Sequence, residues 1–321
     1  MANLKDIRGR ISSVKNIRKI TRAMEMISAA RLRKAEQRIE HLRPYADALR
    51  RMTARAAQAA DNIPNLPILQ ERENVDTVGI LLITGDRGLA GPFNSQILRA
   101  GNQRLRELRS DGKQVLWYAV GRRGVSSLNF RDLEIGASWT GFTDRPAFSD
   151  ARRVADGLVA AYVDDKVDRV EVFYNGYISP VNQEVRHETL LPLQQADVIG
   201  DDEGSDPSPN EGSDRSSREG SDPGRGGDET ERIHERALWI YEPDAEEILA
   251  RLVPDYVEIS IYRAMLESTA SEHGARMSAM RNASDNAAEL IDDLTLAANR
   301  QRQAEITQEI MEVVAGAEGL R

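Results

Sequence analysis

The stretch "LKDIRGRISSVKNIRKITRAMEMISAARLRKAEQRIEHLRPYADAL", residues 4–49, decides the fold of this 321-residue chain. Its apolar side chains recur in alternating steps of three and four residues, which is the spacing of one face of an α-helix. No proline precedes Pro44 and Gly9 is the only glycine. The stretch therefore predicts one helix of about 50 residues, roughly 75 Å long. A helix of that length cannot bury its apolar seam against a small core and needs a second long helix as its partner.

The other end of the chain supplies this partner. After Pro254 apolar residues again recur at helical spacing, with Gly274 as the sole glycine before Gly316. This pattern predicts about 60 residues of helix, roughly 90 Å. A separate short helix over 244–252 is expected before it, because proline is tolerated in the first turn of a helix. We predict that the two chain ends pair lengthwise with each other.

The middle of the chain has the texture of an α/β domain. Apolar, strand-like runs alternate with amphipathic, helix-like runs, which favours a mainly parallel sheet with helices on both faces. The expected strands cover 77–84, 114–121 and 169–179, the expected helices cover 94–110, 122–128 and 149–165, and 184–193 and 237–243 are expected as further or edge strands. The predicted organisation is an N-terminal helix over 1–60, an α/β domain over 75–241 and a C-terminal helix over 244–321.

Charge is distributed unevenly along the chain. Residues 1–60 contain 15 Lys/Arg and 5 Asp/Glu, although the whole chain has a net charge of −9. Such a basic arm is typical either of a partner with acidic groups or of a solvated helix face. Residues 201–232 contain 11 Asp/Glu and 4 Arg among Gly, Ser and Pro. This segment cannot bury enough apolar surface to fold alone, so we expect a disordered acidic insertion.

Several function classes are excluded or disfavoured by composition. The chain has no Cys, so thiolate catalysis, zinc–thiolate sites and disulfides are excluded, and its four His are scattered. No run approaches the roughly 20 apolar residues of a membrane span, and the N-terminus has no apolar signal core. A soluble protein that works where it is made is expected.

The turn "TGDRGLAGPFN", residues 84–94, raises the question of nucleotide binding, because it follows a strand and precedes a helix. Its glycines lack the dinucleotide spacing, and Gly91 is followed by Pro92 and Phe93 rather than by the Lys and Ser/Thr of a P-loop. No other catalytic pattern occurs either. We expect a scaffold here, with no cofactor and no metal.

Together these segments resemble the gamma subunit of the F-type rotary ATP synthase. The resemblance is densest over 6–35, recurs in the turn at 84–94 and in "YEPD" at 241–244, and returns at 275–287 and 306–314. Both ends and the centre match in order and spacing, and only the acidic insertion falls clearly outside the pattern.

The resemblance implies a non-catalytic central shaft, in which the two terminal helices form an antiparallel coiled coil, with a Rossmann-like middle domain. Its implied partners are three alpha and three beta subunits, the epsilon subunit and the membrane c-ring, with the delta subunit in the same complex, and no nucleic acid. The implied location is the cytoplasmic face of a bacterial cell membrane, peripherally. Residues that would contact other subunits by this resemblance are Met24, Arg276, Arg302, Gln303, Thr307 and Glu309.

Two alternatives from other classes remain at this point. A nucleotide-dependent enzyme with helical oligomerisation arms would use the turn at Gly85. A basic coiled-coil nucleic-acid binder would use residues 5–55, although that arm offers only Tyr45 for stacking on bases.

Overall fold

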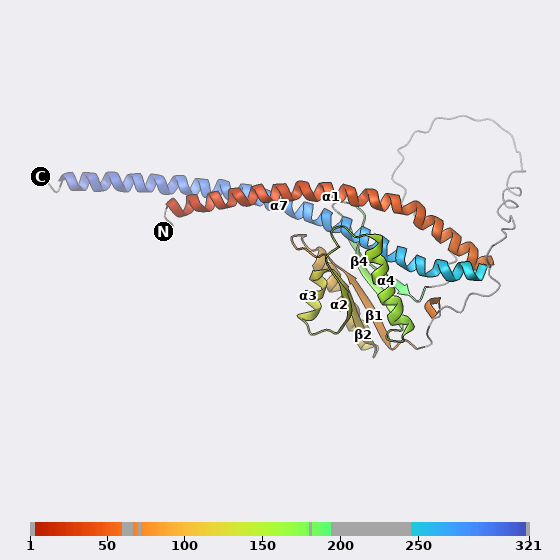
Figure 1. Cartoon of the computed structure of the whole chain (residues 1–321). Helices are drawn as coiled ribbons and strands as arrows, with labels where there is room; N and C mark the ends of the chain where they lie inside the picture. The colour runs from red at the N-terminus through yellow and green to blue at the C-terminus, as the bar shows by residue number, and fades with distance from the viewer. Residues whose placement is uncertain are drawn as a thin grey trace, which may run out of the picture.

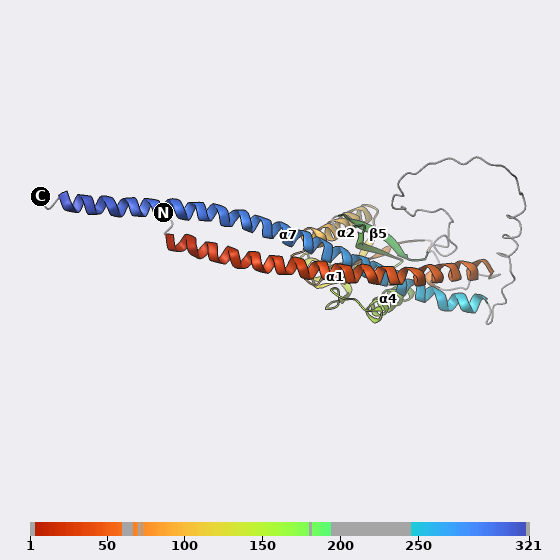
Figure 2. The same cartoon turned by 90° about the horizontal axis from the view of Figure 1, so that it is seen from above.

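Two long helices form a rod, and an α/β domain is attached to one side of it (Figure 1). The computed structural model describes residues 4–59, 67–69, 72, 74–179, 182–193 and 245–318. Helix α1 spans Leu4–Ala59 and helix α7 spans Ala245–Glu318. The helices run in opposite directions and lie side by side in both views (Figures 1 and 2). The predicted antiparallel pairing of the chain ends, with an α/β domain between them, is confirmed.

Small apolar side chains bring the two helices together. Leu32 and Ala35 of α1 form a buried cluster with Ala270 of α7, and Met277 packs against it. Because α7 contacts α1 on one side and the α/β domain on the other, residues 264–276 are buried all round the helix. This explains why the helix is rich in Ala, Ser and Gly there, since small side chains permit close approach on every face.

The prediction of a separate helix over 244–252 is wrong, because α7 runs through Pro254 without a break. Proline lacks an amide hydrogen and clashes with the carbonyl four residues earlier, which normally kinks or ends a helix. Here Val253 and Val257 on either side of it are fully buried in the core of the α/β domain. Tertiary packing therefore outweighs the local preference.

The sheet has five strands in the order β3-β2-β1-β4-β5. Strands β1 to β4 pair in parallel, and β5 pairs antiparallel to β4. The strands are β1 (Thr77–Ile83), β2 (Gln114–Val120), β3 (Ile135–Trp139), β4 (Arg169–Tyr177) and β5 (Gln183–Leu191). The other helices are α2 (Phe93–Ser110), α3 (Arg122–Asn129), α4 (Phe148–Val163) and the short 3₁₀ helix η1 (Pro67–Leu69).

The expected strands and helices that fall on described residues of this domain are all found, and one strand was missed. Strand β3 is an edge strand whose side chains alternate between partly buried and exposed, and it lacks the apolar run that marks β1. The segment at 184–193 forms the predicted edge strand β5. The predicted strand at 237–243 and the acidic insertion at 201–232 lie outside the described residues.

Helix α7 belongs to the core of the α/β domain as well as to the rod. On one face of the sheet, Trp117 and Phe93 pack with α2 and α3. On the other face, Leu81 and Tyr162 pack with residues of α7 such as Met265. Each large apolar side chain buried in this way contributes about 1.5–3 kcal/mol. The domain is therefore joined to α7 by a continuous core rather than by a flexible linker.

Candidate functional site

The glycine turn lies where a doubly wound sheet would bind a ligand. It follows the carboxyl end of β1, and β1 lies beside both β2 and β4, so strand order reverses at this point. In open α/β sheets the crevice at such a reversal is the usual nucleotide site. Position alone would therefore favour the enzyme alternative.

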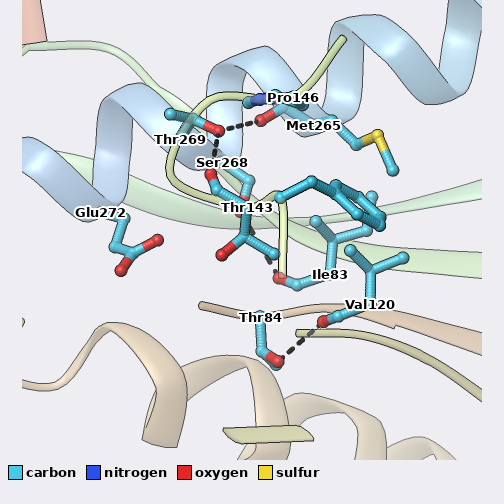
Figure 3. A pocket seen from close by; sticks show the side chains of 10 residues that line it. Ile83, Thr84, Val120, Thr143, Pro146, Met265, Ser268, Thr269 and Glu272 are labelled. Atoms are coloured by element: carbon cyan, nitrogen blue, oxygen red, sulfur yellow. Dashed lines mark hydrogen bonds between the residues drawn. The ribbon is translucent and has the colours of Figure 1, made fainter. Parts of the chain in front are cut away.

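Helix α7 fills this crevice. Ser268 Oγ donates to the carbonyl of Ile83 at 3.4 Å, and Thr269 Oγ1 donates to the carbonyl of Thr143 at 2.9 Å. Glu272 points into the same space (Figure 3). The remaining cavity measures about 10 Å³, the volume of roughly one water probe. A phosphate group would meet the carboxylate of Glu272 rather than an open cradle of backbone amides.

The glycines of the turn allow this close packing. A Cβ on Gly85 would lie 2.7 Å from the carboxylate carbon of Glu272. A Cβ on Gly121, which starts the neighbouring turn with φ of 94°, would lie 2.1 Å from the carbonyl oxygen of Thr84. Glycine is therefore needed here so that backbone and helix can approach each other.

Asp86 organises the turn from within. Its carboxylate accepts hydrogen bonds from the backbone amides of Gly141 at 2.8 Å, Thr143 at 3.1 Å and Arg122 at 3.1 Å, and from the Thr143 hydroxyl at 3.0 Å. Burial alone would raise the pKa of Asp86, but these hydrogen bonds outweigh it and hold the pKa below its usual value. The acidic side chain thus ties together the loops that follow β1, β2 and β3.

A buried ion pair on α7 holds the glycine turn against this helix. Arg276 pairs with Glu272 one helical turn earlier, and the two side chains are 7% and 3% exposed. Arg276 Nη2 also donates to the carbonyl oxygen of Gly88 at 3.3 Å. Burial raises the pKa of Glu272, against the effect of Arg276. Removing either partner would leave a charge buried without compensation.

His273 lies beside this pair and is 1% exposed. Its Nε2 lies 3.4 Å from the carbonyl oxygen of Asp144. Burial lowers the pKa of His273 to about 4, although the nearby Asp144 opposes the shift. The imidazole is therefore neutral at pH 7.

Two of the sequence-predicted contact residues meet at a second, larger cavity. Met24 of α1 and Arg276 of α7 both line a space of about 350 Å³ between the two helices and the glycine turn. Arg87 and Arg123 also line it and have no ion-pair partner among the described residues. The complete lining is Met24, Ile27, Ser28, Arg31, Arg87, Gly88, Leu89, Arg123, His273 and Arg276. The lining thus combines apolar side chains with cationic ones and contains no carboxylate.

The other four predicted residues lie elsewhere. Arg302, Gln303, Thr307 and Glu309 are exposed on the last part of α7, which extends past the start of α1 (Figures 1 and 2). At 1.5 Å per residue this group is roughly 40 Å from Arg276 along the helix. The Thr307 hydroxyl donates to the carbonyl of Gln303 at 2.9 Å, so it is satisfied within its own helix. The six residues therefore form two separate groups.

Sequence reasoning missed Glu272, His273, Thr143 and Asp144. A usable signal existed for Glu272, because Glu272 and Arg276 are spaced i and i+4 within a segment rich in small residues. No comparable signal marks Thr143 and Asp144, which reach the site only through the loop after β3.

Two other kinds of site are absent from the described part of the chain. Within it, no helix is both long enough and apolar enough to cross a bilayer. The same residues contain no cluster of three or more His, Asp or Glu with the arrangement of a metal site.

Known proteins resemble this chain along its whole length. The family model described as ATP synthase matches residues 3–320. The ATP synthase gamma chain of Rubrobacter xylanophilus is 40% identical over 320 residues, which cover 100% of this chain and 99% of that protein. The gamma chain of Trichormus variabilis is 41% identical over 330 residues and covers 100% of both chains.

Solved structures agree at the level of the fold. A chain of the Euglena gracilis mitochondrial ATP synthase rotor aligns with a TM-score of 0.60 at 17% identity, covering 94% of this chain and 98% of that one. A chain of the Tetrahymena thermophila mitochondrial ATP synthase central stalk aligns with a TM-score of 0.54 at 22% identity, covering 83% and 99%. With the full-length sequence similarity, the long helix pair and the filled nucleotide crevice, the chain belongs to the ATP synthase gamma chain family.

Proposed function

We propose that this chain is the central rotor shaft of a proton-driven ATP synthase. It couples rotation of the membrane ring to conformational cycling of the alpha and beta subunits during ATP synthesis or hydrolysis, and it carries out no chemistry itself. The observation that carries the proposal is the continuity of α7, which is packed into the α/β core at one end and extends as a rod at the other. A turning force on the domain reaches the far end of the rod without crossing a loop.

The rod acts through its asymmetry. Two different helices present a different face in each direction, so three identical partner sites around the rod would each meet a different surface. A site populates a conformation only to the extent that the rod contacts that conformation better than the alternatives. Turning the rod would therefore pass each site through the same series of states.

The proposed partners follow from this arrangement and from the family. The rod lies within a ring of three alpha and three beta subunits, and the α/β domain lies outside the ring, close to the epsilon subunit and the membrane c-ring. The delta subunit belongs to the same complex. The location is the cytoplasmic face of a bacterial cell membrane, where the chain is held peripherally by its partners.

Two contact surfaces are proposed on the rod. The first is the cavity beside Met24. Its Arg87 and Arg123 have no ion-pair partner in the part of the chain that the structure describes, and they favour an acidic loop of a beta subunit. The second is the end of α7 with Arg302, Gln303, Thr307 and Glu309, where exposed apolar residues such as Ile310 accompany the polar ones. An ion pair of a solvent-exposed arginine contributes less than about 1 kcal/mol of binding free energy in water, so the effect of such contacts depends on partial desolvation between the subunits.

Arg276 fits this proposal in a different way from the other five residues. Its guanidinium is already engaged by Glu272 and by the carbonyl of Gly88. We infer that it shapes the contact surface by holding the glycine turn on the shaft, and that its edge at the cavity meets the partner loop.

Co-expression with the alpha and beta subunits of the same source tests the function. The expected product is a complex with three copies of each and one copy of this chain, whose ATPase activity drives rotation of the rod. A folded chain that forms no such complex, and that binds ATP or NAD in equilibrium dialysis, would establish the enzyme alternative instead. Steeply salt-dependent binding to DNA or RNA would establish the nucleic-acid binder.

Charge reversal tests the two contact surfaces separately. R87E combined with R123E should lower coupled ATPase activity of the complex and leave folding of the isolated chain unchanged, because both side chains are exposed. R302E should do the same at the far end. R131E is the matched control, since Arg131 is an exposed arginine on the α/β domain outside both surfaces. Equal effects of R131E and the test variants would refute the assignment of specific surfaces.

A further inference from the structure

Among the described residues, helix α1 reaches the α/β domain through two polar bridges, although it packs mainly on α7. Arg31 forms an ion pair with Asp144 in the loop after β3. Glu36 accepts a hydrogen bond from the hydroxyl of Tyr177, the last residue of β4. We call these four residues, Arg31, Asp144, Glu36 and Tyr177, the clip.

The two bridges leave α1 on opposite sides of its apolar seam. At 100° per residue, Arg31 and Glu36 are about 140° apart around the helix axis. Leu32 and Ala35, which pack on α7, lie at about 100° and 40° on the same scale, between the two. The apolar contact is therefore flanked by one polar bridge on each side.

The same arrangement holds on α7. The Asp144 end of the clip lies against His273, and the Tyr177 end lies against Glu267, whose carboxylate accepts from the Tyr177 amide. Glu267 and His273 are about 120° apart around α7, and Ala270 lies midway between them. The clip thus straddles α7, and α7 is held between α1 and the domain.

Directionality distinguishes the clip from the seam. Apolar packing is non-directional, so contact between Leu32, Ala35 and Ala270 alone would let α1 roll around α7. Charge-assisted hydrogen bonds need particular angles and are stronger than neutral ones. Burial, with the nearby Glu36, raises the pKa of Tyr177, so its hydroxyl remains a donor.

We propose that the clip fixes the angular position of α1 around α7 relative to the α/β domain, and that its four members are positioning residues for rotary coupling. The proposal rests on the proposed function, because the angular position matters when a surrounding ring reads the faces of the rod. Loss of the clip would let α1 lag behind the domain under load, and the ring would then meet a displaced face.

The first test needs no partner subunit. Hydrogen exchange of the full chain is compared for the original sequence, R31Q, Y177F and the combination of both. Exchange of α1 amides near residues 31–36 should accelerate about tenfold in the combination, equivalent to ~1.4 kcal/mol. R33Q is the matched control, because Arg33 is an exposed arginine two residues away. Equal exchange rates in all variants would overturn the proposal that the clip holds α1 in place.

The second test measures coupling in the assembled complex with its membrane ring in vesicles. D144N/Y177F breaks both bridges without changing a residue that lines the proposed contact cavity, so it should hydrolyse ATP at close to the original rate but lose ATP-driven proton pumping, whereas R33Q should keep both. Hydrolysis and pumping falling together would indicate a merely structural role and would overturn the proposal. If the original chain does not assemble, the proposed function fails, and the exchange measurement still decides whether the clip exists.

Discussion

Replacing Gly85 with alanine should force the glycine turn away from the shaft. The new Cβ would lie 2.7 Å from Glu272 Oε1, whereas ordinary contacts begin near 3.4 Å, so one group must move by about 0.7 Å. Glu272 cannot move freely, because it is 2% exposed and paired with Arg276. The φ of Gly85 is not positive, so steric contact alone decides. Overpacking costs about 1–3 kcal/mol and the stiffer unfolded chain returns about 0.4–1, giving a net loss of about 1–2 kcal/mol.

A double-mutant cycle in urea, followed by tryptophan fluorescence, to which the buried Trp117 contributes, measures this effect. E272A alone should cost about 3–5 kcal/mol, because Arg276 is left buried without its partner. In the E272A background, G85A should be neutral or slightly stabilising, since the clashing carboxylate is gone. G9A is the control: no atom lies within 4 Å of its new Cβ, so it should stabilise α1 by about 0.5–1 kcal/mol. An equal cost of G85A in both backgrounds would refute the close-approach explanation.

Three further predictions concern backbone geometry and pH. G121A should destabilise the chain by more than about 3 kcal/mol and G112A by only about 1–2, because both glycines have positive φ but only Gly121 faces a backbone oxygen; comparing their urea midpoints checks this. The pKa of His273 is lowered to about 4 by burial, so the unfolded chain takes up the proton first and about 3 kcal/mol of stability should be lost as pH falls from 6.5 to 4. Thermal unfolding of H273Q, measured over the same pH range, should lack that loss of stability. If H273Q and the original chain lost the same stability between pH 6.5 and 4, the role of His273 would be contradicted. Burial alone would raise the pKa of Glu171, but hydrogen bonds from Arg104 and the neighbouring histidine outweigh it and lower the pKa to about 2. The contribution of Glu171 to folding stability is therefore complete above pH 4.5 and is lost as the pH falls towards 2. E171Q should remove this acid sensitivity. If the stability of E171Q fell with pH in parallel with that of the original chain, the ion pair between Glu171 and Arg104 would be contradicted.

The helical ends and most of the sheet could be predicted because their signals are local. Steps of three and four residues and apolar runs reflect burial of one face, which each segment encodes by itself. Strand β3 gives no such signal, because an edge strand covered on neither face completely has no apolar run. The prediction of a helix boundary at Pro254 was wrong for the opposite reason. Proline does destabilise a helix locally, but packing of the nearby Val253 and Val257 outweighs that cost.

The candidate site was less accessible to sequence reasoning. The residues after Gly91 show that the glycine turn is unsuited to binding phosphate. They do not show why the turn contains glycines, because that reason depends on Glu272, some 190 residues later in the chain. Likewise Arg276 looks like any helix-surface arginine in the sequence. Its burial follows from the convergence of α1, α7 and the turn, which no single segment encodes.

The last part of α7 continues beyond Leu4 of α1 as a single helix (Figure 2). Two helices packed side by side resist bending far more than one, because bending the pair must stretch one member and compress the other. Compliance is therefore concentrated at the tip, while the paired stretch near the domain stays stiff. The tip of α7 can therefore bend to follow small displacements, while α7 stays firmly packed in the α/β domain at the other end.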